Sequence, residues 1–123
     1  MSNTKSEQKY LINCQDGAKD VERATISFIL AVTASKTGEA AVFITSDAAQ
    51  LCVKGGANGL EFYGLEPLAN LIDQFVGNGG KIWLCPVCAT VKGITEDDLI
   101  EGAEIAGAPK TMAFLASGGK VLA

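Results

Sequence analysis

Two cysteines, Cys85 and Cys88, are separated by two residues and directly follow the short apolar run Lys81–Leu84. That run follows a cluster of glycine and asparagine turn residues, so it predicts a buried strand. Pro86 favours the first position of a helix, because its missing N–H would have had no intrahelical partner there. The sequence therefore predicts Cys85 as the N-cap of a short helix that ends at Gly93.

At an N-cap, the Cys85 sulfur would face the free N–H groups of Val87 and Cys88. The helix end then stabilises the thiolate over the thiol and makes Cys85 the better nucleophile. Cys88 falls one turn later, at a spacing that brings the two sulfurs near each other. Such a pair is able to hold a group on Cys85 or to cycle between dithiol and disulfide. The alternative is plain core packing, since free cysteine is among the most often buried residue types.

The elements that position this pair alternate along the chain. Turn residues and apolar spacing predict strands at 9–13, 40–45, 60–63 (weakly), 81–84 and 120–122. Caps and helical spacing predict helices at 20–36, 48–53, from Pro67 onward, 86–93, 95–107 and 109–117. Strands that alternate with helices indicate an α/β fold, with a mostly parallel sheet covered on both faces. The 123 residues are expected to form a single domain, 1–123.

Three polar or sulfur-bearing residues each follow a predicted strand, and ligands of parallel sheets gather beyond the carboxyl ends of the strands. Cys14, Asp47 and Cys85 are therefore expected to line one crevice as catalytic or substrate-binding residues. For Cys14 the alternative is a buried strand-end cysteine, and Asp47, with Ser46, is also a natural N-cap for the helix at 48–53. Lys92 would add positive charge from the short helix, although a solvated lysine is the simpler interpretation.

Two further stretches are assigned structural roles. The helix at 20–36 is apolar around much of its girth, which suggests a subunit interface on the side away from the sheet. Thr95 to Asp98 resembles a capping box at the start of the helix at 95–107, and its three acidic residues are interpreted as capping and solvation instead of catalysis.

Composition excludes several function classes. The net charge of -4 argues against a nucleic-acid backbone as the partner. The polar N-terminus lacks the apolar stretch of a secretory signal, and no segment is apolar enough to span a membrane. We therefore expect a cytoplasmic protein with reduced cysteines.

The chain contains no histidine, which removes the usual general base and the commonest nitrogen ligand of zinc. A zinc site would need all four cysteines, Cys14, Cys52, Cys85 and Cys88, but only one Cys-x-x-Cys pair is present. Cys52 is interpreted as a packed small side chain. No metal and no cofactor are expected.

The sequence resembles the DsrE/F-like proteins of sulfur relay and sulfur oxidation, which include sulfurtransferase subunits that act in tRNA thiolation. The resemblance is carried by Gly80-Lys-Ile-Trp-Leu-Cys85-Pro-Val-Cys88-Ala-Thr-Val-Lys92-Gly93-Ile94, by the following Leu99-Ile-Glu-Gly-Ala103, expected to be helical, by Phe43-Ile-Thr-Ser-Asp47 and by Lys120-Val-Leu. It implies a three-layer α/β/α fold with a five-stranded, mostly parallel sheet, and assembly into trimers or hexamers.

The resemblance places the active cysteine eight residues before the glycine of an Arg/Lys-Gly-Ile/Val signature, which is Cys85 here. Lys92 stands where many relatives carry arginine. The implied function is that of a sulfur carrier or sulfurtransferase, which holds sulfur as a persulfide on Cys85 and exchanges it with donor and acceptor proteins or small thiols. Two alternatives remain: a dithiol/disulfide redox protein that uses Cys85 and Cys88, and a non-catalytic subunit of a sulfur-handling complex.

Overall fold

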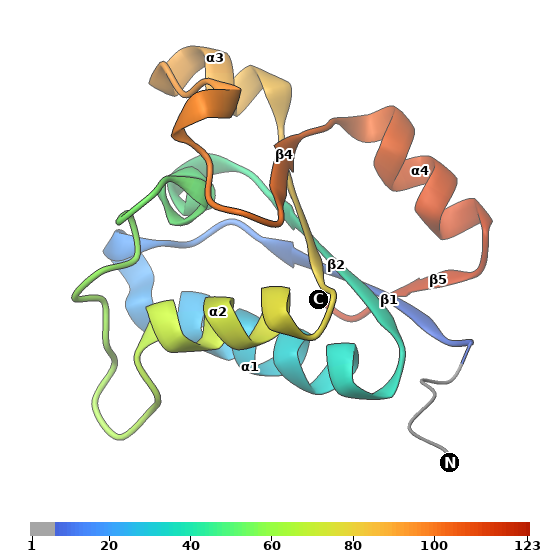
Figure 1. Ribbon diagram of the computed structural model, residues 1–123, viewed down its shortest axis with the longest axis horizontal. Coiled ribbons are helices and arrows are strands. Elements are labelled where there is room, and N and C mark those ends of the chain that lie inside the picture. The colour runs from blue at the N-terminus through green and yellow to red at the C-terminus, as the bar shows by residue number, and fades with distance from the viewer. Residues whose placement is uncertain (1–6) are drawn as a thin grey trace.

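Five parallel strands form the centre of the molecule (Figure 1). The computed structural model describes residues 7–123, so most of the polar segment on which the absence of a secretory signal was predicted lies outside the described residues. The strand order is β4-β3-β2-β1-β5, and every pairing is parallel. The strands are β1 (Lys9–Cys14), β2 (Glu39–Ile44), β3 (Lys81–Leu84), β4 (Ala103–Ile105) and β5 (Gly119–Val121). The predicted α/β fold with a five-stranded parallel sheet is confirmed.

Helices cover both faces of the sheet, because successive side chains along each strand point to opposite sides. On one face, Ile12, Val42 and Ile82 belong to the main core. Figure 1 shows α1 (Val21–Thr37) and α2 (Leu68–Gly77) side by side on this face, where the 3₁₀ helix η2 (Ser46–Cys52) also packs into the core. These helices form the outer layer on this side of the sheet.

The opposite face is covered by α4 (Ala108–Ala116) through a smaller cluster. Trp83 of β3 and Phe114 of α4 meet edge to face, with ring centroids 5.4 Å apart. Leu11 and Ala41 complete this cluster. Trp83 is a core residue, since its side chain is buried.

The long first helix forms as predicted. Asp20 caps it by accepting a hydrogen bond from the backbone N–H of Arg23 over 3.1 Å, and Gly38 follows its last residue. Phe28 and Val32 face the core, whereas Ile26 and Leu30 are exposed on the other side. The subunit interface expected on that side stays a prediction.

Two predicted elements are wrong. Residues 60–63 form no strand, and the helix expected at 95–107 is replaced by the 3₁₀ turn η3 (Glu96–Asp98) followed by β4. The capping box between Thr95 and Asp98 is present, but it closes only this one turn. The chain then leaves the helical path because the Ile100 N–H donates to the Cys52 carbonyl over 2.8 Å and Gly102 adopts a left-handed φ of 89°.

Candidate functional site

The candidate site lies at the junction between β3 and the short helix α3 (Pro86–Lys92). Cys85 is the N-cap of α3, and its own N–H donates to the Ile44 carbonyl at the end of β2 over 3.0 Å. Gly93 ends the helix in the left-handed conformation, with φ 70° and ψ 29°. The predicted strand, cysteine, proline and helix order is therefore the observed one, and the β2 contact fixes the cysteine backbone.

The environment of Cys85 favours its thiolate. The backbone N–H of Cys88 lowers the pKa of the Cys85 thiol most strongly; partial burial opposes this, and the Val87 N–H and the Cys88 thiol lower it further. The Cys85 side chain is only half-buried. A thiolate that is both stabilised by N–H donors and open to solvent is the form of cysteine that attacks sulfur and other soft electrophiles.

Cys88 is held by a contact from the first residue of η2. Its Sγ atom accepts a hydrogen bond from the backbone N–H of Ser46 over 3.3 Å. Ser46 has a φ of 56°, a conformation that non-glycine residues seldom adopt and that is found most often at functional sites. All four cysteines are free thiols. Cys85 and Cys88 are thus brought together as the spacing predicts, whereas the Ser46 contact has no signal in the sequence.

Cys14 lies at the same edge of the sheet but is buried. Burial raises its pKa to about 11, and its thiol donates to the Asp16 carbonyl over 3.5 Å. Cys52 is also buried, and burial raises its pKa to about 12. Both thiols therefore stay protonated near neutral pH and have no access to solvent, which agrees with the alternative interpretation of Cys14 as a buried strand-end cysteine.

Asp47 also lies at this edge, but its role as an N-cap is wrong. Thr45 precedes η2, and no side chain caps that helix. The Asp47 carboxylate instead accepts hydrogen bonds from the backbone N–H groups of Gly17 and Lys19, over 3.1 and 3.0 Å. Asp47 therefore holds the loop after β1 against η2.

Lys92 stands in the last turn of α3, at the opposite end from Cys85. At a rise of about 1.5 Å per residue, a seven-residue helix separates its two ends by about 9 Å. The Lys92 side chain is exposed. The structure brings Lys92 onto the same short helix as the candidate nucleophile, but not next to the Cys85 sulfur.

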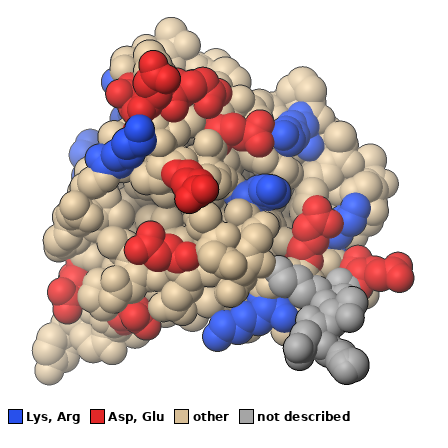
Figure 2. Space-filling model, viewed as in Figure 1, with Lys and Arg blue, Asp and Glu red and all other residues tan. Residues whose placement is uncertain are grey.

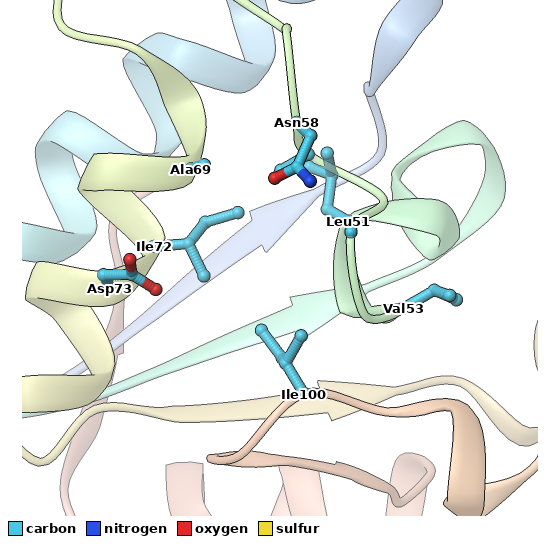
Figure 3. A pocket seen from close by; sticks show the side chains of 9 residues that line it. Leu51, Val53, Asn58, Ala69, Ile72, Asp73 and Ile100 are labelled. Atoms are coloured by element: carbon cyan, nitrogen blue, oxygen red, sulfur yellow. The ribbon is translucent and has the colours of Figure 1, made fainter.

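Several hollows lie near the ends or faces of the sheet, and one of them borders the cysteine helix. Figure 3 shows a small recess of about 120 Å³ between α2 and the loop after η2, with Ile72, Leu51 and Ile100 around it. A groove of about 390 Å³ lies between Trp83 and α4. A shallow hollow of about 270 Å³ lies against α3 itself, lined by Pro86, Val87, Thr90 and Val91.

Sequence reasoning missed the exposure of Val87 and Val91. The signal was present, because two valines four residues apart on a short helix share one face.

Within residues 7–123, no group of three or more His, Cys, Asp or Glu side chains is arranged to hold a metal ion. No helix in that range is long and apolar enough to cross a membrane.

Comparison with known proteins identifies a family and a relative that match nearly the whole chain. The model of the DsrE/DsrF-like family matches residues 8–123. The uncharacterised protein MJ0760 of Methanocaldococcus jannaschii is 33% identical over 113 residues, which are 91% of this chain but 41% of that protein. The chain therefore spans less than half the length of this relative.

Two solved structures share the fold. The ychN protein of E. coli superposes with a TM-score of 0.73 and 23% identity, and covers 94% of this chain and 97% of its own. MTH1491 of Methanobacterium thermoautotrophicum, a protein of unknown function, gives a TM-score of 0.65 and 13% identity, with 95% and 98% covered.

Proposed function

The chain belongs to the DsrE/DsrF-like family, and from this membership and the environment of Cys85 we propose that it is a sulfur carrier which holds sulfur as a persulfide on Cys85. The observation that carries the proposal is the N-cap position of Cys85. There, two backbone N–H groups and the Cys88 thiol lower the pKa of a sulfur that remains open to solvent. The family membership supports a role in sulfur handling in general terms.

The transfer needs no oxidant. The Cys85 thiolate attacks the outer sulfur of a donor persulfide, so that a new bond forms between Cys85 Sγ and that sulfur. The sulfur–sulfur bond of the donor breaks, and the donor leaves as a thiolate. An acceptor thiolate then attacks the outer sulfur on Cys85 and the Cys85 thiolate leaves. Because a leaving thiolate departs faster when its pKa is low, the same N–H donors assist the second step.

Cys88 supports an alternative, a dithiol/disulfide cycle. Attack by a Cys88 thiolate on the inner sulfur of the Cys85 persulfide would form the Cys85–Cys88 disulfide and release hydrosulfide, after which a reducing thiol would be needed. The hydrogen bond from the Ser46 N–H favours a Cys88 sulfur that is held in place beside Cys85. A non-catalytic subunit of a sulfur-handling complex is the third possibility, in which Cys85 would not load.

Intact-mass analysis after incubation with glutathione persulfide tests the proposal. We expect an addition of about 32 Da per sulfur on the wild type and on Cys88→Ser, and none on Cys85→Ser. Cys52→Ser is the matched control, because Cys52 is buried and should not affect loading. Loading of Cys85→Ser to the wild-type level would refute the carrier. A loss of two protons that needs both Cys85 and Cys88 would establish the dithiol cycle instead.

We also propose that the chain works as a homotrimer or homohexamer, in a reducing compartment such as the cytoplasm, with donor and acceptor proteins or small thiols as partners. Exposed apolar side chains on α1, including Ile26 and Leu30, support a contact between copies. Sedimentation equilibrium of the wild type and of Leu30→Glu is the test. A monomeric wild type would refute the assembly.

A further inference from the structure

The outer face of α3 is apolar where it meets solvent. Val87 and Val91 are 69% and 78% exposed, the largest exposures among the large hydrophobic side chains of the described residues after that of Tyr63. The two valines lie one turn apart, on the side of α3 that faces away from the buried Ala89. A helix face exposed to solvent ordinarily carries polar residues. Val87 and Val91, with Pro86 and Thr90 beside them, are called here the α3 ridge.

The α3 ridge borders the reactive thiol. Pro86 directly follows Cys85, and the Val87 N–H is one of the donors that lower the pKa of the Cys85 thiol. The ridge residues line the hollow of about 270 Å³ on this helix. A partner that contacts the ridge therefore stands beside the sulfur that is to be exchanged.

Acidic side chains flank the ridge on the turn that follows α3. Glu96, Asp97 and Asp98 form the 3₁₀ turn η3, and Glu101 is exposed shortly after it. Figure 2 shows acidic side chains gathered over the part of the molecule that carries η3 in Figure 1. Lys54, which donates to the Asp97 carbonyl over 3.0 Å, and the exposed Lys92 offset part of this negative charge. Because the carboxylates outnumber these two cations, a surface that contacts both the ridge and this turn should combine apolar residues with positive charge.

The ridge is too small for a permanent interface. Four residues of a seven-residue helix expose far less than the roughly 800 Å² that each partner buries in a stable complex. Small interfaces belong to encounters that form and dissolve quickly, as delivery or removal of one sulfur atom requires.

We propose that the α3 ridge is the docking surface for a transient protein partner that exchanges sulfur with Cys85, and that this partner presents its cysteine on an apolar segment flanked by basic residues. The inference rests on the proposed function. It specifies a protein as the exchange partner, whereas the proposed function also includes small thiols. The valines supply the contact, and η3 supplies the charge preference.

Disulfide exchange with three synthetic peptides tests the docking surface separately from sulfur loading. Each peptide carries one cysteine as a mixed disulfide with thionitrobenzoate: the first between leucines and lysines, the second between serines and lysines, and the third between leucines and glutamates. The Cys85 thiolate attacks the peptide sulfur and releases coloured thionitrobenzoate, with no net oxidation. Cys88→Ser is used as the parent protein, so that the mixed disulfide persists.

The leucine-lysine peptide should react about fivefold or more faster than either of the others, because partial burial of two valine side chains supplies a difference of that size. Val91→Ser should bring the rate of the leucine-lysine peptide toward that of the serine-lysine peptide, while the rate with glutathione-thionitrobenzoate stays unchanged. Met112→Ser is the matched control, since Met112 is 61% exposed on α4, on another face.

Equal rates for the three peptides in the parent protein would overturn the proposal, as would a Val91→Ser variant that slows the reactions with the leucine-lysine peptide and with the glutathione disulfide to the same extent. A fall in sedimentation mass on Val87→Ser would overturn it too, by making the ridge an interface between copies. If Cys85 fails to load sulfur but keeps the peptide preference, sulfur carriage is refuted and the docking surface stands. Loading without any preference refutes the docking surface alone.

Discussion

The Sγ atom of Cys88 accepts a hydrogen bond from the backbone N–H of Ser46 over 3.3 Å, across 42 residues of sequence. This contact fixes the first turn of α3 onto the segment that follows β2. The Cys88 thiol also lowers the pKa of the Cys85 thiol. A substitution at position 88 therefore changes the chemistry of Cys85 without altering the backbone N–H groups that face it.

Replacement of Cys88 should raise the pKa of the Cys85 thiol. Cys88→Ala removes the side-chain donor, whereas Cys88→Ser keeps a hydroxyl donor and should shift the pKa less. The rate of alkylation by iodoacetamide, followed from pH 5 to 10, reports the pKa of the Cys85 thiolate. In the wild type its midpoint should lie below 9.0, the ordinary pKa of a cysteine thiol. Identical midpoints in the wild type and Cys88→Ala would contradict the contribution of Cys88.

Alkaline pH should destabilise the fold through the buried thiols. Folding raises the pKa of Cys14 from 9.0 to about 11 and that of Cys52 to about 12, so their contribution is fully present below pH 9. Between pH 9 and 11 the unfolded chain releases these protons first, and the free energy of unfolding falls by about 1.4 kcal/mol per pH unit for each thiol. Urea unfolding measures this slope.

Cys14→Ala provides the control for that slope. The variant should lose about half of the thiol-dependent fall between pH 9 and 11, whatever its stability at pH 8. If wild type and variant show parallel curves, groups other than the buried thiols govern the alkaline transition.

Gly93→Ala should destabilise the protein by about 1 kcal/mol, because an alanine at φ 70° brings its Cβ close to the following carbonyl oxygen. Outside Gly93 and its chain neighbours, no heavy atom lies within 4 Å of the added Cβ, so the cost is conformational. Gly77→Ala is the matched control: that site is also open, but it lies in α2 at a negative φ and should gain a few tenths of a kcal/mol. Thermal unfolding of both variants tests this prediction. Equal shifts of the two unfolding midpoints would exclude the left-handed conformation of Gly93 as the cause.

Asp47→Ala should lower the free energy of unfolding by about 1–2 kcal/mol, since two backbone N–H groups lose a charged acceptor. Asp47→Asn keeps one acceptor oxygen and should lose less. The alkylation rate of Cys85 should stay at the wild-type value in both. A Cys85 rate that falls while stability is unchanged would instead place Asp47 in the substrate site.

Local signals predicted the part of the site that depends on local geometry. Pro86 and Gly93 restrict the backbone so strongly that they define the start and end of α3 almost without help from the rest of the chain. The position of Cys85 follows from these two residues and from the apolar run before them. The fold class followed from the alternation of strands and helices.

The parts that failed depend on distant contacts. The capping box at Thr95 favours a helix, but the Ile100 N–H bonds to Cys52 and the Ile105 N–H bonds to the Glu96 carboxylate over 3.1 Å. Those bonds place β4 beside β3, where Ala103 and Glu104, two residues of weak strand preference, are extended by pairing with that strand. The Ser46 contact with Cys88 likewise exists only once β2 and β3 are neighbours.

The sheet ends on both sides in strands of only three residues, β4 and β5. Each outer strand therefore presents very few unpaired backbone groups to another molecule, too few to seed a continuous intermolecular ladder. A concentrated solution of the folded protein should accordingly resist growth into cross-β fibrils, and any association must proceed through side chains on its helices.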